Sequence, residues 1–143
     1  MDDWIRSRMY WDTTLSYNDL REEFLNAYYG DASSYVLQYI EKIESAFGST
    51  EFALGDDLTV SQLKSRYSSS WVSQTKTIFD NAYSAVSGNA EITRRLDYLS
   101  MFYRYLQIKC SYTGADKATF KTMCESLGIY KVEINLTVED FTK

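Results

Sequence analysis

Four pairs of carboxylate residues are the side chains in this sequence that come closest to acid–base machinery. They are Asp2 and Asp3, Glu22 and Glu23, Glu41 and Glu44, and Asp56 and Asp57. Hydrolysis of a glycosidic bond by two carboxylates needs the acid groups to be held about 5–9.5 Å apart across a cleft. Adjacent residues of a helix point about 100° apart, so a pair such as Glu22 and Glu23 is typical of a solvated face. The sequence therefore predicts no catalytic residue among them.

The absence of histidine limits the chemistry further, because Ser-His-Asp and Cys-His catalysis and histidine metal ligation all require it. Asp56 and Asp57 could hold a cation weakly, but Leu58-Thr59-Val60 does not supply the alternating oxygen ligands of a calcium loop. No glycine-rich phosphate loop is present. Two Ser-x-x-Lys strings, at 61–64 and 73–76, lack the companion motifs of penicillin-recognising enzymes. We predict no metal, no cofactor and no enzymatic activity for the chain by itself.

The length and net charge of the chain limit the number of domains and the kinds of partner that can be expected. The chain has 143 residues with 15 basic and 20 acidic side chains, a net charge of −5. This length predicts one domain, residues 1–143. The acidic balance argues against nucleic acid or an anionic membrane as the main partner. No apolar run approaches the ~20 residues of a membrane span, so no membrane insertion is expected. The segment 1–6 does not read as a signal peptide, and the compartment stays open.

The elements that must position any site are predicted to be helices, because apolar residues recur at helical rather than alternating spacing. Proline is absent, and single glycines fall between the apolar stripes. Helices are expected at 4–11, 17–29, 31–47, 90–113 and 115–127, with a loop at 49–57. A short helix capped by Thr59 or Ser61 is expected to run to Tyr67, and a longer one from Ser69 or Ser70 to Gly88. We predict a single all-α bundle of about six or seven helices.

Three local features refine this prediction. Ser16, with Asp19 three residues later, is expected to form a variant capping box. The helix capped by Asn89 carries a broad apolar face, which predicts a central helix with several neighbours. That face consists of Ile92, Leu96, Leu99, Phe102, Tyr103, Tyr105, Leu106 and Cys110. Cys110 and Cys124 are interpreted as small buried hydrophobic residues rather than as a disulfide pair.

The C-terminal tail allows two interpretations. Tyr130, Val132, Ile134 and Leu136 alternate like a strand, but a lone strand would have no partner. Alternatively, Thr137 together with Asp140 caps a terminal helical turn.

Aromatic residues make up 16% of the chain, and thirteen of them are tyrosines. Trp4, Tyr10 and Trp11 lie on the short first helix, and Tyr28 and Tyr29 end the second. Such rings either form the core or contact sugars and protein partners. The first helix is apolar nearly all round, which a terminal helix of a free-standing bundle does not need. We therefore predict that these five residues form or support an interface with another folded unit.

Three strings carry a resemblance to a known family: RSRMYWD at 6–12, LREEFLNAYYGDA at 20–32 and YVLQYI at 35–40. They resemble the helical region that follows the barrel in an uncharacterised bacterial group of glycoside-hydrolase-like proteins. More distantly, they are similar to the C-terminal helical domain of alpha-glucuronidases. Arg94-Arg95-Leu96-Asp97 also resembles that region. Thr13 and Asp31 depart from the pattern, since both positions are proline in the family.

The resemblance implies an accessory role in a carbohydrate-active protein, with the chain a fragment of a larger one. In such enzymes the barrel carries the acid and base carboxylates, and no barrel lies within these 143 residues, so no catalytic residue is carried over. The implied partners are a catalytic barrel, on which the helices would pack or whose cleft they would shape, or a second copy of the chain. Relatives of this kind are often exported. The alternatives are a free-standing helical module that binds protein and, as a third hypothesis, a small hydrolase using carboxylates in a groove.

Overall fold

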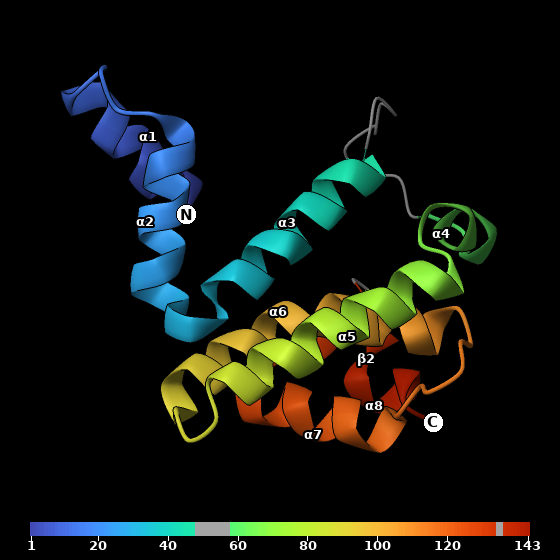
Figure 1. Cartoon of the computed structure of the whole chain (residues 1–143). Coiled ribbons are helices and arrows are strands. Elements are labelled where there is room, and N and C mark those ends of the chain that lie inside the picture. The colour runs from blue at the N-terminus through green and yellow to red at the C-terminus, as the bar shows by residue number, and fades with distance from the viewer. Residues whose placement is uncertain (48–57, 134–135) are drawn as a thin grey trace.

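Helices follow one another along almost the whole chain in the computed structural model, which describes residues 1–47, 58–133 and 136–143 (Figure 1). They are α1 (Asp2–Trp11), α2 (Tyr17–Tyr29), α3 (Ser33–Phe47), α4 (Val60–Arg66), α5 (Ser69–Ala85), α6 (Ala90–Lys109), α7 (Lys117–Leu127) and the one-turn α8 (Val138–Phe141), with a 3-10 turn η1 (Gly30–Ala32) and two short strands, β1 (Lys131–Glu133) and β2 (Leu136–Thr137). The predicted all-α bundle is confirmed. Seven helices of the described residues have at least seven residues each.

Several helices begin directly after a residue whose side chain accepts a hydrogen bond from the backbone of the first helical turn. Thr59, one of the two predicted caps, forms a full capping box with Gln62. The Asn89 side chain caps α6 as predicted and accepts a hydrogen bond from the Ile92 N–H at 3.1 Å. α5 begins at Ser69, one of the two predicted residues, and Ser68 caps it by accepting a hydrogen bond from the Trp71 N–H at 3.2 Å. Consecutive serines offer equivalent hydroxyl groups, so the sequence alone does not choose between them.

Two starts near the N-terminus also differ from expectation. Ser16 precedes α2 as predicted, but its side chain makes no capping hydrogen bond, so the capping box with Asp19 is wrong. The next helix begins at Ser33 instead of Asp31, because η1 intervenes. Gly30 ends α2 as expected and adopts φ +52° and ψ −128°, a combination that only glycine adopts without strain. This residue turns the chain sharply from α2 toward α3.

The end of α6 corrects another prediction. The helix stops at Lys109, five residues before Gly114, because a Schellman motif closes it. Ser111 adopts φ +54°, its N–H donates to the Ile108 carbonyl at 3.1 Å, and the Tyr112 N–H donates to the Gln107 carbonyl at 2.8 Å. Residues other than glycine rarely adopt the left-handed region, so the sequence gives no reason to expect a helix to end at this serine. At the end of α7, by contrast, Gly128 has φ +72° and is the predicted cap.

Both interpretations of the C-terminal tail are partly right. β1 and β2 pair antiparallel, so the expectation that a strand would lack a partner is wrong: the partner follows it along the same tail. The Thr137 hydroxyl then accepts from the Asp140 N–H at 3.1 Å and caps α8, as predicted. Ile134, Gly48 and the expected loop at 49–57 lie outside the described residues.

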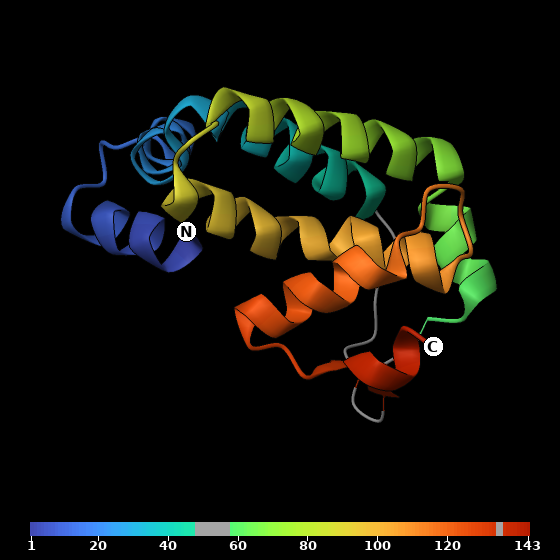
Figure 2. The same cartoon turned by 90° about the horizontal axis from the view of Figure 1, so that it is seen from below.

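The bundle is arranged around α6, which lies between α5 and α7 (Figure 2). α3 packs against α5, and α2 also contacts α6. Leu96, Tyr103 and Leu106 on α6 are at most 1% exposed, which confirms the predicted central helix. The two termini lie at opposite ends of the molecule (Figures 1 and 2).

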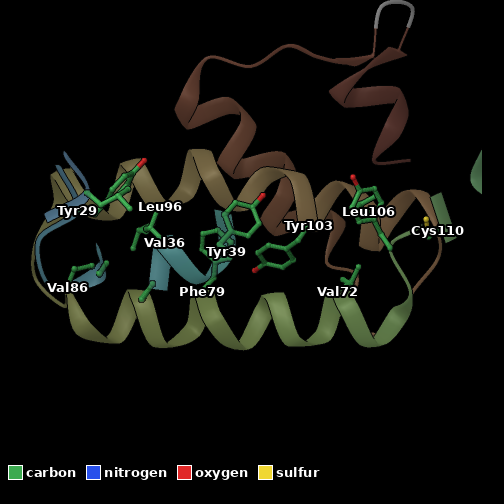
Figure 3. Close-up of a cluster of buried hydrophobic side chains, with 14 of the residues drawn as sticks. Tyr29, Val36, Tyr39, Val72, Phe79, Val86, Leu96, Tyr103, Leu106 and Cys110 are labelled. Carbon is green, nitrogen blue, oxygen red and sulfur yellow. The ribbon is translucent and has the colours of Figure 1, made fainter. Parts of the chain in front are cut away.

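The main core is rich in aromatic side chains (Figure 3). The Phe79 ring lies 4.9 Å from the Tyr39 ring and 5.3 Å from the Tyr103 ring, measured between centroids, so α3, α5 and α6 meet at one point. Cys110 belongs to this core as a free thiol, whereas Cys124 is buried in a second cluster with Phe120 and Val138. Burial raises the pKa of the Cys124 thiol to about 11.

Glu133 joins β1 to α6, and this link carries a pH-dependent prediction. Its Oε1 accepts from Lys109 Nζ and from the Tyr105 hydroxyl, each at 2.6 Å. Both hydrogen bonds hold the Glu133 pKa below its ordinary value of 4.5, and the bond from Lys109 has the larger effect. A lowered pKa in the folded state means that the stabilisation is present above pH 4.5 and is lost as the pH falls through the folded-state pKa.

Glu133→Gln is therefore expected to lower the free energy of unfolding by up to about 1 kcal/mol at neutral pH, since the pair is partly solvent-exposed. The difference from wild type should shrink as the pH falls below 4.5, which urea unfolding at a series of pH values measures. Glu22→Gln removes an exposed carboxylate without an ion pair to the described residues and is the matched control. A Glu133→Gln effect that stays constant with pH would contradict the ionic role.

Candidate functional site

Helix α1 lies along α2 at the end of the molecule far from α4 (Figure 1). Its first turn carries Asp2 and Asp3 and its last turn Arg8, charges that suit the helix dipole. Ile5 is fully buried, the Trp4 ring lies 5.7 Å from the Phe24 ring, and Arg8 pairs with Glu23 at 3.5 Å. One side of α1 is therefore firmly attached to α2.

The C-terminal end of α1 presents two large aromatic side chains to solvent. Tyr10 is 86% exposed and Trp11 91% exposed. Because they are consecutive on a helix, their side chains point about 100° apart. Neither makes a ring contact or hydrogen bond with the residues that the structure describes. An exposed tryptophan beside an exposed tyrosine is the composition typical of binding surfaces.

The other three predicted interface residues belong to an aromatic row that leads away from α1. Trp4 contacts Phe24, Phe24 stacks on Tyr28 at 5.3 Å, and Tyr28 meets Tyr29 edge-on at 5.0 Å. Tyr28 is 40% exposed, whereas Tyr29 is only 8% exposed and its burial raises its pKa to about 12. The structure thus brings Trp4, Tyr28 and Tyr29 together through Phe24, and leaves Tyr10 and Trp11 outside this row.

Arg95 on α6 is held against the end of the row. Its guanidinium lies 3.8 Å from the centre of the Tyr28 ring and donates hydrogen bonds to the Tyr28 carbonyl and to the Glu91 carboxylate. A guanidinium stacked on a ring and bonded on its edge has little remaining freedom. Arg95 therefore fixes α2 against the first turns of α6.

A polar groove of about 410 Å³ opens beside this contact. It is lined by Tyr28, Tyr29, Glu91, Arg94, Arg95, Tyr98 and Leu127. Sequence reasoning missed Glu91, Arg94 and Tyr98 as site residues. Their spacing with Arg95, i, i+3, i+4 and i+7, puts all four on one face of α6 and was a signal that could have found them.

A second groove of about 410 Å³ lies between α6, α7 and β1. Its lining is mainly apolar and comprises Met101, Phe102, Tyr105, Phe120, Ile129, Lys131 and Val132. It continues the second hydrophobic cluster outward.

The carboxylate pairs do not converge on a cleft. Glu41 and Glu44 both pair with Arg21, at 3.8 and 3.7 Å, and so join α3 to α2. Asp2, Asp3, Glu22 and Glu23 are exposed, and Asp56 and Asp57 lie outside the described residues. In the parts of the chain that the structure describes, no three Cys, Asp or Glu side chains are grouped so that they could hold a metal ion. None of the described helices combines the length and the hydropathy needed to cross a membrane.

Two features of the described residues are therefore candidate binding surfaces: the exposed aromatic pair Tyr10 and Trp11 at the end of α1, and the arginine–tyrosine groove between α2 and α6. Comparison with protein-family models, with curated proteins and with solved structures finds no match to this chain.

Proposed function

We propose that this chain is a non-catalytic helical module that docks on a second folded unit through the exposed end of α1. The resemblance in residues 6–40 makes that unit the catalytic barrel of a glycoside-hydrolase-like, carbohydrate-active protein. The observation that carries the proposal is the exposure of Tyr10 and Trp11, at 86% and 91%. A helix attached by one side and ending in two solvated rings has the form of a docking element.

Physical considerations support a protein partner for this end of α1. Each large aromatic side chain buries about 150–250 Å² when covered, so two neighbouring rings supply a strong apolar contact. Tyrosine and tryptophan also keep a hydroxyl and an indole N–H for hydrogen bonds at the rim of an interface. The Trp4–Phe24 contact and the Arg8–Glu23 pair hold the helix in place before binding, which lowers the entropic cost of docking.

The test starts from the coding sequence around this chain, which should encode a barrel in the same reading frame or in a neighbouring gene. That barrel is expressed alone and titrated with the helical chain by calorimetry. We expect the Tyr10→Ala/Trp11→Ala double variant to bind at least about 100-fold more weakly, because two central aromatic residues are lost. Tyr130→Ala removes a tyrosine that is 78% exposed and lies between α7 and β1, outside α1, and it should leave the affinity unchanged.

Two results would overturn the proposal. Unchanged binding by the double variant would show that the barrel docks elsewhere. Lack of an encoded barrel would remove the accessory role and favour the free-standing interaction module. Light scattering on the purified chain adds a third readout: a dimer that the double variant dissociates would make a second copy the partner of α1.

A further inference from the structure

The groove between α2 and α6 offers a cationic group that the fold itself does not use. Arg94 is exposed, and it has no hydrogen bond or ion pair with the described residues, in contrast to its neighbour Arg95. Both line the groove, but Arg95 is committed to Tyr28 and Glu91. Arg94 is thus the guanidinium in the groove that remains available to a ligand.

The net charge of the groove side chains favours a ligand that carries one negative charge. Glu91 contributes −1 and Arg94 and Arg95 contribute +1 each, which leaves +1 within a chain whose net charge is −5. The planar fork of a guanidinium matches a carboxylate with two parallel hydrogen bonds. A phosphate dianion would exceed the available charge and would meet the carboxylate of Glu91.

The walls of the groove favour a ring-shaped body attached to that carboxylate. Tyr98 is 66% exposed and follows Arg94 by four residues, so both lie on the same face of α6. The Tyr28 ring is already engaged by Phe24 and Arg95, which leaves Tyr98 as the ring with a free face. Leu127 adds an apolar contact from the end of α7. A flat or cyclic group can pack against these side chains while its carboxylate reaches Arg94.

We propose that this groove is a binding site for cyclic monocarboxylates. Arg94 binds the carboxylate, Tyr98 and Leu127 pack against the ring, and Tyr28 borders the site. Arg95 acts indirectly, since it positions Tyr28 and partly neutralises Glu91. The site is separate from the Tyr10–Trp11 surface, so this proposal does not depend on the proposed function.

The experiment titrates the isotope-labelled chain with benzoate and follows the Arg94 side-chain and Tyr98 ring resonances by NMR. Saturable binding with a Kd of the order of 1 mM is expected for a ligand of this size. Benzamide, the neutral analogue, and inorganic phosphate should each bind at least about tenfold more weakly. Failure to saturate, or equal binding of benzamide or phosphate, would overturn the proposal.

Variants assign the binding to named residues. Arg94→Gln is expected to weaken benzoate binding at least about tenfold, and Arg94→Lys, which keeps the charge but loses the fork, should fall between it and wild type. Arg6→Gln removes an exposed arginine of α1 and should leave the Kd unchanged. Thermal unfolding checks that each variant is folded. If Arg94→Gln folds and binds benzoate as wild type does, Arg94 does not bind the carboxylate and the proposal is wrong.

Discussion

Phe79→Ala is expected to lower the free energy of unfolding by about 3–5 kcal/mol, the largest effect of any single change considered. Phe79 is 1% exposed and its ring contacts Tyr39 on α3 and Tyr103 on α6. Truncation leaves a cavity where three helices meet, and it removes the aromatic contacts with α3 and α6 in addition to the buried area. Urea unfolding followed by far-ultraviolet circular dichroism measures the change.

Two controls separate this cavity effect from a general cost of losing an aromatic residue. Tyr10→Ala removes a helical tyrosine that is 86% exposed and should change stability by less than about 0.5 kcal/mol. Phe79→Leu keeps most of the volume and should lose clearly less than Phe79→Ala, which keeps the comparison measurable if the alanine variant unfolds. A Phe79→Ala variant less than about 1 kcal/mol below wild type would mean that α3, α5 and α6 do not meet at this residue.

Gly30→Ala is expected to cost about 2–4 kcal/mol, because two penalties combine at one position. The backbone has φ +52° with ψ −128°, a region that residues with a side chain avoid. A Cβ atom there would also lie 3.3 Å from Ile92 Cδ1, so the Ile92 side chain would have to shift slightly. Thermal or urea unfolding gives the magnitude.

Gly88→Ala is the matched control for that prediction. Gly88 also has a positive φ, +88°, but a Cβ at this position would have no neighbour within 4 Å. Gly88→Ala should therefore lower the free energy of unfolding through the unfavourable backbone conformation alone, by about 1–2 kcal/mol. Equal losses in the two variants would show that the contact with Ile92 contributes nothing, and the tight junction between η1 and α6 would then need a different explanation.

The groove between α2 and α6 and the end of α1 illustrate what local sequence can and cannot show about a site. Trp4, Tyr10 and Trp11 are close in sequence, and their grouping on one short helix was enough to predict an interface there. Tyr28 and Arg95 are 67 residues apart, and only the packing of α2 on α6 brings them together. The same packing buries Tyr29 beside the exposed Tyr28, a distinction that two adjacent tyrosines do not reveal.

The sequence by itself determined the helical class, the central position of α6 and the helix cap at Asn89, because each depends on periodicity or on bonds within four residues. Tertiary structure decided which serine caps α5, where α6 ends and which strand pairs with β1. It also decided which arginine of the Arg94–Arg95 pair is held by the fold and which faces solvent. The roles of Arg94 and Arg95 differ because of a contact between segments 67 residues apart. The other outcomes are choices between neighbouring residues whose local preferences differ by only small energies.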